Sequence, residues 1–152
     1  MPDRTTLRAA ITALSEEIQA GIISDPPTAG KPFRRLIQGE VKGDEFARPF
    51  LAIRLERAKP LASSEGDRLF ESSVGLSIAA DVAGDAHDGI LALVAAVEDL
   101  FDALQGSGLI EGADGFDDRA WSFRYAPTTS GARRVLAEAT MGLVVRVARE
   151  LN

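Results

Sequence analysis

Alternation of apolar and polar positions in residues 135–147 predicts a long strand. Every odd-numbered position over these thirteen residues is apolar, whereas the even positions include Glu138, Thr140 and Arg146. Successive side chains of a strand point to opposite faces, so this period of two is typical of a half-buried strand. A strand of this length either spans a sheet or protrudes from it to pair elsewhere.

The same period predicts three further strands. Residues 49–57 and 70–82 form two of them, with a loop at 58–68 between them, and we expect them to pair as antiparallel neighbours. Residues 121–125 form the third, and residues 127–133 return the chain to the final strand. The face expected beneath a helix holds Leu51, Ile53, Leu55, Val74, Leu76, Ile78, Leu143, Val145 and Val147.

Helical periodicity appears twice. In residues 7–22 one apolar residue recurs every three or four positions, and Asp3 or Thr5 is placed to cap the start. A second, broader apolar face occupies residues 90–104, after an N-cap at Asp85 and before Gly106. These faces consist of Leu7, Ile11, Leu14, Ile18 and Ile22, and of Ile90, Leu91, Val94, Val97, Leu100, Phe101 and Leu104.

This order of elements predicts an α+β fold in a single domain, residues 1–152. We expect a mainly antiparallel sheet of about four strands with two helices packed on one face. Residues 24–48 are irregular, with a possible short strand in 33–41. Two interpretations of this segment stay open, a loop that orders against a partner and a well-packed surface loop.

Composition narrows the function classes. The chain has 152 residues, no cysteine and a formal net charge of −6, which argues against general nucleic-acid binding and excludes thiol chemistry. Adjacent basic residues occur only at Arg34-Arg35 and Arg133-Arg134, and surface solvation explains both pairs. No apolar run is long enough for a membrane span, and the N-terminus lacks the layout of a signal peptide.

Candidate catalytic residues are few. His87 beside Asp85 or Asp88 suggests a general base, but a surface position in the first helical turn explains it better. The acidic group of Asp81, Asp85 and Asp88 lacks the spacing and glycine of a calcium loop. For the group at 114–118, solvation of a loop is the preferred interpretation and weak calcium binding the alternative. No phosphate loop or GxSxG or HExxH motif occurs. We therefore expect no enzyme activity, no cofactor and no metal.

The aromatic residues Trp121, Phe123 and Tyr125 alternate with polar ones. Such a row serves as a base-stacking platform in single-strand binders, where basic residues surround it. No basic surround is present here, so packing in the core or at an interface is the preferred interpretation.

The order of elements in this small, acidic, cysteine-free chain resembles that of the phage tail-terminator (tail-completion) proteins. Segments such as RPFLAIRLERAKPL at 48–61 and RRVLAEATMGLVVRV at 133–147 are similar to strands of that family. The resemblance implies a homo-oligomeric ring, typically a hexamer, that caps the tail tube and joins it to the head or neck. Its partners would be the tail-tube and neck proteins, and its location the virion after synthesis in the host cytoplasm.

Two alternatives stay open: another head-to-tail connector or tail-tube subunit, and a small ligand-binding or enzymatic α+β domain. If a ring surrounds a DNA path, we expect an acidic lumen and no binding of duplex DNA, with Arg133 and Arg134 facing a neighbouring subunit or solvent. The candidate subunit or partner contacts are Leu61, Ser63, Arg68, Pro127, Thr128, Arg133, Arg134, Phe33 and Arg35.

Overall fold

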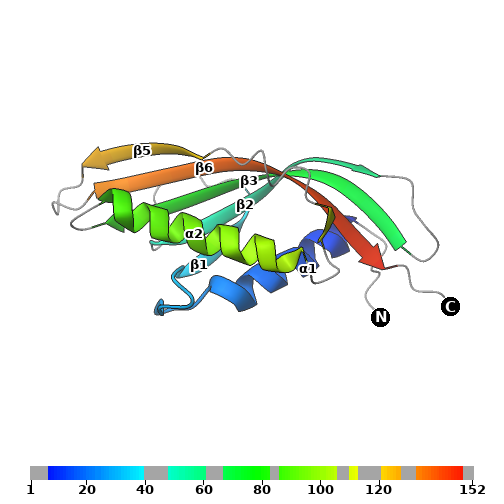
Figure 1. Cartoon of the computed structure of the whole chain (residues 1–152), viewed down its shortest axis with the longest axis horizontal. Helices are drawn as coiled ribbons and strands as arrows, with labels where there is room; N and C mark the ends of the chain where they lie inside the picture. The colour runs from blue at the N-terminus through cyan, green and yellow to red at the C-terminus, as the bar shows by residue number, and fades with distance from the viewer. Residues whose placement is uncertain are drawn as a thin grey trace.

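The computed structural model describes residues 7–39, 48–60, 67–82, 86–105, 110–112, 121–127 and 133–148. These residues form two helices and one sheet that arches over them (Figure 1). The helices are α1 (Leu7–Ile22) and α2 (Ala86–Leu104). The strands are β1 (Arg35–Gln38), β2 (Phe50–Pro60), β3 (Asp67–Val82), β4 (Ile110–Gly112), β5 (Ser122–Pro127) and β6 (Arg133–Ala148).

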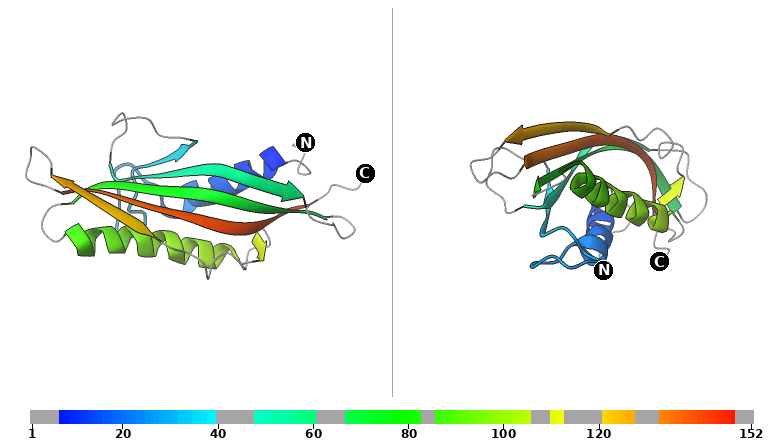
Figure 2. Two further views of the ribbon diagram at one scale, coloured as in Figure 1. Left: turned by 90° about the horizontal axis from the view of Figure 1, so that it is seen from above. Right: turned by 60° about the vertical axis from the view of Figure 1, so that its left-hand side comes forward.

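Pairing within the sheet confirms the predicted α+β class. The strand order is β1-β2-β3-β6-β4, and β5 also pairs with β6. Only β1 and β2 run parallel; the other pairs are antiparallel. Strands β3 and β6, each of 16 residues, pair over their whole length from Asp67↔Ala148 to Val82↔Arg133. They form the long axis of the sheet, as both views in Figure 2 show.

The irregular segment is ordered within the chain as far as residue 39. The Ser24 amide donates to the Phe33 carbonyl at 2.8 Å, and the Arg34 amide donates to the Pro49 carbonyl at 2.8 Å. Strand β1 confirms the short strand predicted in 33–41, and Gly39, with a φ of 100°, follows it. For residues 24–39 this is the well-packed alternative; residues 40–47 lie outside the described part.

The hairpins are longer than their sequence predicted. Strand β2 continues to Pro60 and β3 begins at Asp67, so residues 58–60 and 67–68 of the predicted loop belong to strands, and residues 61–66 lie outside the described part. A β-bulge between Leu55 and Arg57 shifts the register there. Such a bulge bends its strand and strengthens its twist. Leu55, which precedes the bulge, is 41% exposed and not buried beneath a helix, which corrects that prediction.

The core lies between the helices and one sheet face, which we call the covered face. Helix α2 packs on β3 and β6, and α1 packs on α2, β6 and β1. The predicted stripes are buried at most positions, but Leu91 is 41% exposed and belongs to the outer side of α2. The largest fully buried side chains are Phe33, Phe101, Leu14, Ile18, Leu51, Leu76, Ile78, Ile90 and Val74.

Candidate docking surface on the open sheet face

The sheet face opposite the helices, here called the open face, is also apolar at its centre. Antiparallel register brings Phe50 of β2, Ala79 of β3 and Leu136 of β6 into one row across the sheet. Ala52 lies next to Phe50 along its face and opposite Ile37 of β1. Phe50, Ala52 and Ala79 are buried and pack with Ile37 and Leu136 as a second cluster, separate from the main core.

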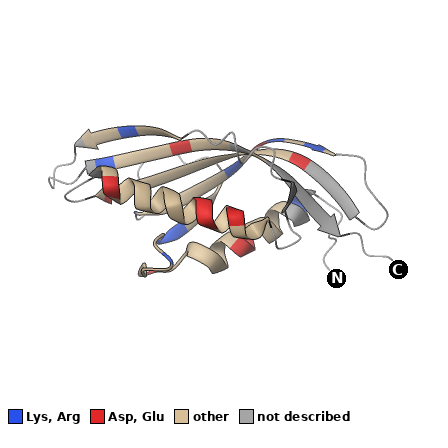
Figure 3. Cartoon of the chain, viewed as in Figure 1, with Lys and Arg blue, Asp and Glu red and all other residues tan. Residues whose placement is uncertain are grey.

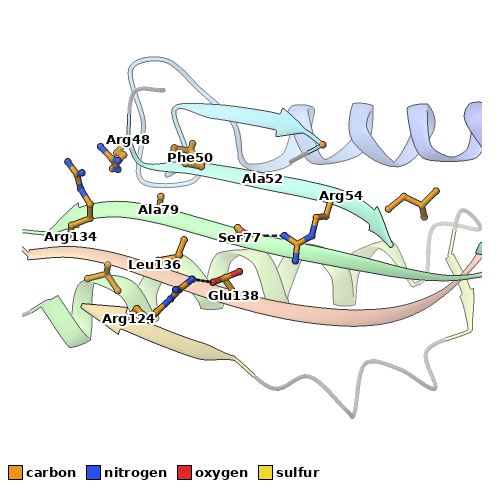
Figure 4. Close-up of a pocket in the computed structure, with 13 residues that line it drawn as sticks. Arg48, Phe50, Ala52, Arg54, Ser77, Ala79, Arg124, Arg134, Leu136 and Glu138 are labelled. Atoms are coloured by element: carbon orange, nitrogen blue, oxygen red, sulfur yellow. Dashed lines mark hydrogen bonds and ion pairs between the residues drawn. The ribbon is translucent and has the colours of Figure 1, made fainter. Parts of the chain in front are cut away.

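A groove of about 820 Å³ runs over this cluster. Its lining combines the apolar residues with four arginines, Arg48, Arg54, Arg124 and Arg134, and with Ser77 and Glu138. Figure 4 shows these side chains on the strands, with the apolar residues between the arginines. We call this feature the sheet groove.

At one end of the sheet groove, Asp81 forms ion pairs with two arginines. Arg134 Nε lies 3.2 Å from Asp81 Oδ1, and Arg48 Nη1 lies 3.9 Å from Asp81 Oδ2. Arg134 and Asp81 are direct cross-strand partners, and opposite charges in that position favour each other. The Arg48 side chain is only 12% exposed, so its guanidinium forms part of the wall.

At the other end, Arg54 lies across the backbone of β3. Its Nη2 is 3.1 Å from Glu56 Oε1, and its Nη1 donates to Ser77 Oγ at 3.4 Å. Gly75 is the cross-strand partner of Arg54, and a Cβ built at Gly75 would lie 2.8 Å from Arg54 Cζ. A glycine is therefore needed here for the guanidinium to lie flat on the strand.

Along the side of the groove, Arg124 of β5 pairs with Glu138 of β6, with Arg124 Nη2 donating to Glu138 Oε1. The Arg124 side chain is 73% exposed. Since a guanidinium carries five N–H donors, an exposed arginine bound to one carboxylate keeps donors for a second. The groove is therefore an apolar floor with polar groups at its border.

Charge is divided between the two layers. Helices α1 and α2 hold six carboxylates and one arginine, whereas the six strands hold nine basic and six acidic residues. Figure 3 shows the red residues concentrated on the helices and most of the blue ones on the strands. The net charge of −6 is therefore unevenly distributed: the helix layer is acidic, whereas the strands carry more basic than acidic residues.

The structure places the predicted contact residues in different surroundings. Phe33 is fully buried in the main core, because its amide bonds the Ile22 carbonyl and its bridge to Ile23 draws it inward, so its side chain is not a surface contact. Arg35 is exposed and lies beside Phe50 in the register. Arg134 lines the sheet groove.

The remaining predicted contacts lie in the ladders of the sheet or outside the described residues. Arg68, Pro127 and Arg133 lie within ladders, opposite Val147, Arg133 and Pro127 respectively, and not in loops. Leu61, Ser63 and Thr128 lie outside the described residues. Of the three predicted positions whose side chains the structure describes, Arg134 lines the groove, whereas Phe33 and Arg35 do not.

The sequence missed the floor of the groove, although a signal was present. Phe50, Ala52, Ala79 and Leu136 fall between the predicted core positions and are themselves apolar. A strand that is apolar on both faces is typical of a sheet covered on both sides. These exceptions to strict alternation mark the second apolar face.

Candidate chemistry elsewhere is limited. His87 is exposed in the first turn of α2, and Trp121 and Phe123 pack against the main core while Tyr125 is 44% exposed. Within the described ranges, no three histidines or carboxylates are grouped so as to hold a metal ion. Neither of the helices described is long and apolar enough to cross a membrane.

Comparison with known proteins adds no relative to this picture. No protein-family model matches the chain, and no curated protein matches its sequence.

Proposed function

We propose that this protein is a subunit of a tail-terminator ring in a phage tail or phage-derived particle. The observation that supports the proposal best is the sheet groove, an apolar surface with arginines at its border on the face that neither helix covers. Buried interface centres are likewise apolar, and arginine and aromatic residues are enriched at them. A second observation is the resemblance of the order of elements to that family.

The proposed role is geometric. A ring of identical subunits would end polymerisation of the tail tube and present one side to the tube protein and the other to the neck. A closed ring needs a head-to-tail contact, in which two different surfaces of the subunit meet. An acidic helix layer and a groove bordered by arginines are two such surfaces on one chain.

The test is the mass and shape of the purified protein. Light scattering during size-exclusion chromatography should give a fixed multiple of 16.2 kDa, and negative-stain electron microscopy should show rings. A protein that stays monomeric at high concentration and in its native particle contradicts the proposal. An open filament would favour the tail-tube alternative, because a head-to-tail contact that does not close gives a filament.

A small ligand-binding domain is the second candidate, since a groove of about 820 Å³ with arginines at its border suits an anionic compound with an apolar body. This alternative predicts a monomer whose melting temperature rises with such a compound. Gene neighbours offer an independent observation, since portal, major tail and tape-measure genes beside this one would favour the ring.

A further inference from the structure

We infer that the sheet groove of one subunit receives the outer face of helix α2 of a second copy of this chain. This contact rests on the proposed ring, because it supplies the head-to-tail interface that the ring needs. Three features of the described residues support it: the composition of the α2 face, its length and its charge.

The outer face of α2 is apolar in the middle and acidic at its ends. Asp88 lies in the first turn, and Asp99 and Asp102 lie near the end of the helix. Between them, Leu91, Ala92 and Ala95 are exposed. At about 100° per residue these positions share one face about 100° wide, opposite the buried Val97 and Phe101. Figure 3 shows the red segments at both ends of α2.

The order of acidic and apolar residues along α2 matches the order of basic and apolar residues along the groove. The apolar floor at Phe50, Ala52 and Leu136 corresponds to the central leucine and alanines of α2. Arg48 and Arg134 lie at one end of the groove, and Arg54 lies at the other. Carboxylates at both ends of the helix would therefore meet guanidinium groups at both ends of the groove.

The lengths agree as well. Asp88 and Asp102 are fourteen positions apart, which is about 21 Å at the rise of an α-helix. In the groove, Arg134 is paired with Asp81 of β3 and Arg54 with Gly75 of β3. These two positions of β3 are six residues apart, which is about 20 Å at the rise of a strand. Small side chains at Ala92 and Ala95 let the helix approach the floor closely.

Charge favours the α2 face over other parts of the second copy. The outer face of α2 carries three carboxylates and no basic residue, whereas the groove holds four arginines against Asp81, Glu56 and Glu138. The exposed Arg124 has donors for a second carboxylate. A contact between two copies of the groove, in contrast, would bring arginines against arginines.

Disulfide trapping tests the contact directly, because the chain contains no cysteine. The Ser77→Cys variant places a thiol on the floor of the groove, and Ala95→Cys places one at the centre of the outer α2 face. Mixing the two variants and oxidising them should give a linked pair. The matched control replaces Ala95→Cys with Thr12→Cys on the exposed side of α1. We expect about tenfold less linked product from the control, since a thiol outside the contact lacks the high effective concentration.

The variant that combines Ser77→Cys and Ala95→Cys in one chain tests whether the subunits form a closed ring. Under oxidation it should give a ladder on a denaturing gel that ends at the copy number of the ring. Rings that form without linkage through Ala95→Cys would overturn this contact and leave the proposed function standing, for example with a tube or neck protein in the groove. A linked ladder without an end would support the contact and contradict the ring.

Charge reversal gives a second, independent readout. Asp99→Arg/Asp102→Arg should dissociate the ring, and mixing this variant with Arg54→Glu/Arg124→Glu should restore assembly. Glu16→Arg/Glu17→Arg on exposed positions of α1 is the control and should leave the ring intact. Assembly that survives the α2 reversal, or that is lost equally in the α1 control, would overturn the inference.

Discussion

The two faces of the sheet are both apolar at their centres, yet they differ in what surrounds the apolar residues. On the covered face, Leu51, Leu76 and Val135 are completely buried against the helices, in a core whose buried polar side chains among the described residues are Ser15 and Ser72. On the open face, Phe50, Ala79 and Leu136 lie among arginines and their carboxylate partners. The first arrangement is that of a folding core, and the second has the composition that the proposed interface between subunits requires.

The difference also shows in how charge is compensated. Arginine on the open face pairs with Asp81, Glu56 or Glu138, and these pairs are partly exposed. Exposed pairs add little to folding stability, because solvent screens them and the side chains lose entropy. Substitutions of the paired charged residues on the open face should therefore spare folding and change assembly, whereas substitutions in the covered core should lower folding stability.

The largest expected effect concerns the two sides of α2. Phe101 is completely buried, so Phe101→Ala should lower the free energy of unfolding by about 3–5 kcal/mol, as truncation of a core phenylalanine does. Leu91→Ala on the outer side should change it by about 0.5 kcal/mol or less and should weaken the ring. Urea unfolding gives the stabilities and light scattering gives the assembly.

The control for this pair is the shape of the unfolding curve, since equal slopes mean that both variants expose similar surface. Equal losses of stability in the two variants would mean that the inner and outer sides of α2 do not differ in their contribution to folding. A Phe101→Ala variant that folds normally and only loses assembly would reverse it.

A smaller effect is expected at Gly75. The Cβ of Gly75→Ala would displace the ends of the Arg54 and Glu56 side chains, which are flexible, and alanine suits a strand better than glycine. We expect stability to change by about 1 kcal/mol or less, while the ring weakens because the guanidinium no longer lies flat on β3.

Gly30→Ala serves as the control for Gly75→Ala, since a Cβ there meets no atom within 4 Å. Unfolding curves and light scattering of both variants provide the comparison. If Gly75→Ala assembles as well as Gly30→Ala, the position of Arg54 does not matter for the ring.

The faces also differed in how well the sequence predicted them. Strict alternation in β3 and β6 predicted the correct face for Leu76, Ile78 and Val135. A strand with a period of two can be oriented in only two ways, and one of them buries all its apolar side chains. Leu55 was predicted wrongly, because alternation indicates the face of a strand residue but not whether another element covers that position. Buried Phe33 depends on a bridge to Ile23 across an irregular segment, which local patterns do not reveal.

The apolar residues of the groove floor are visible in the sequence, but their assembly into one groove could not be predicted, for a related reason. Its floor depends on the register that aligns Phe50, Ala79 and Leu136 across three strands. Register follows from the whole sheet and from turn geometry, whereas the sequence shows each strand alone. The arginine pairs follow from the same register, so their positions could not be read before the pairing was known.

A still smaller effect is expected from the ion pair at the end of the groove. Arg134→Ala removes the contact with Asp81, and both side chains are more than a third exposed. The stability change should be about 0–1 kcal/mol. Assembly should weaken more than stability does, and raising the salt concentration should weaken the unaltered ring in the same direction, because ions screen pairs across an interface. An assembly insensitive to both would exclude charge as a source of affinity.

The smallest expected effect is on DNA, where we predict none. The chain carries 23 acidic and 17 basic residues, so the phosphates of DNA meet a molecule with the same sign of net charge. Affinity for duplex DNA comes mainly from basic residues that replace counterions. A gel-shift experiment at low salt should show no complex, either with the unaltered protein or with Arg133→Glu/Arg134→Glu. Tight binding by the unaltered protein that this double variant abolishes would mean that the open face grips the DNA backbone. In that case the groove would be a nucleic-acid surface, and the comparison between a folding face and an assembly face would fail.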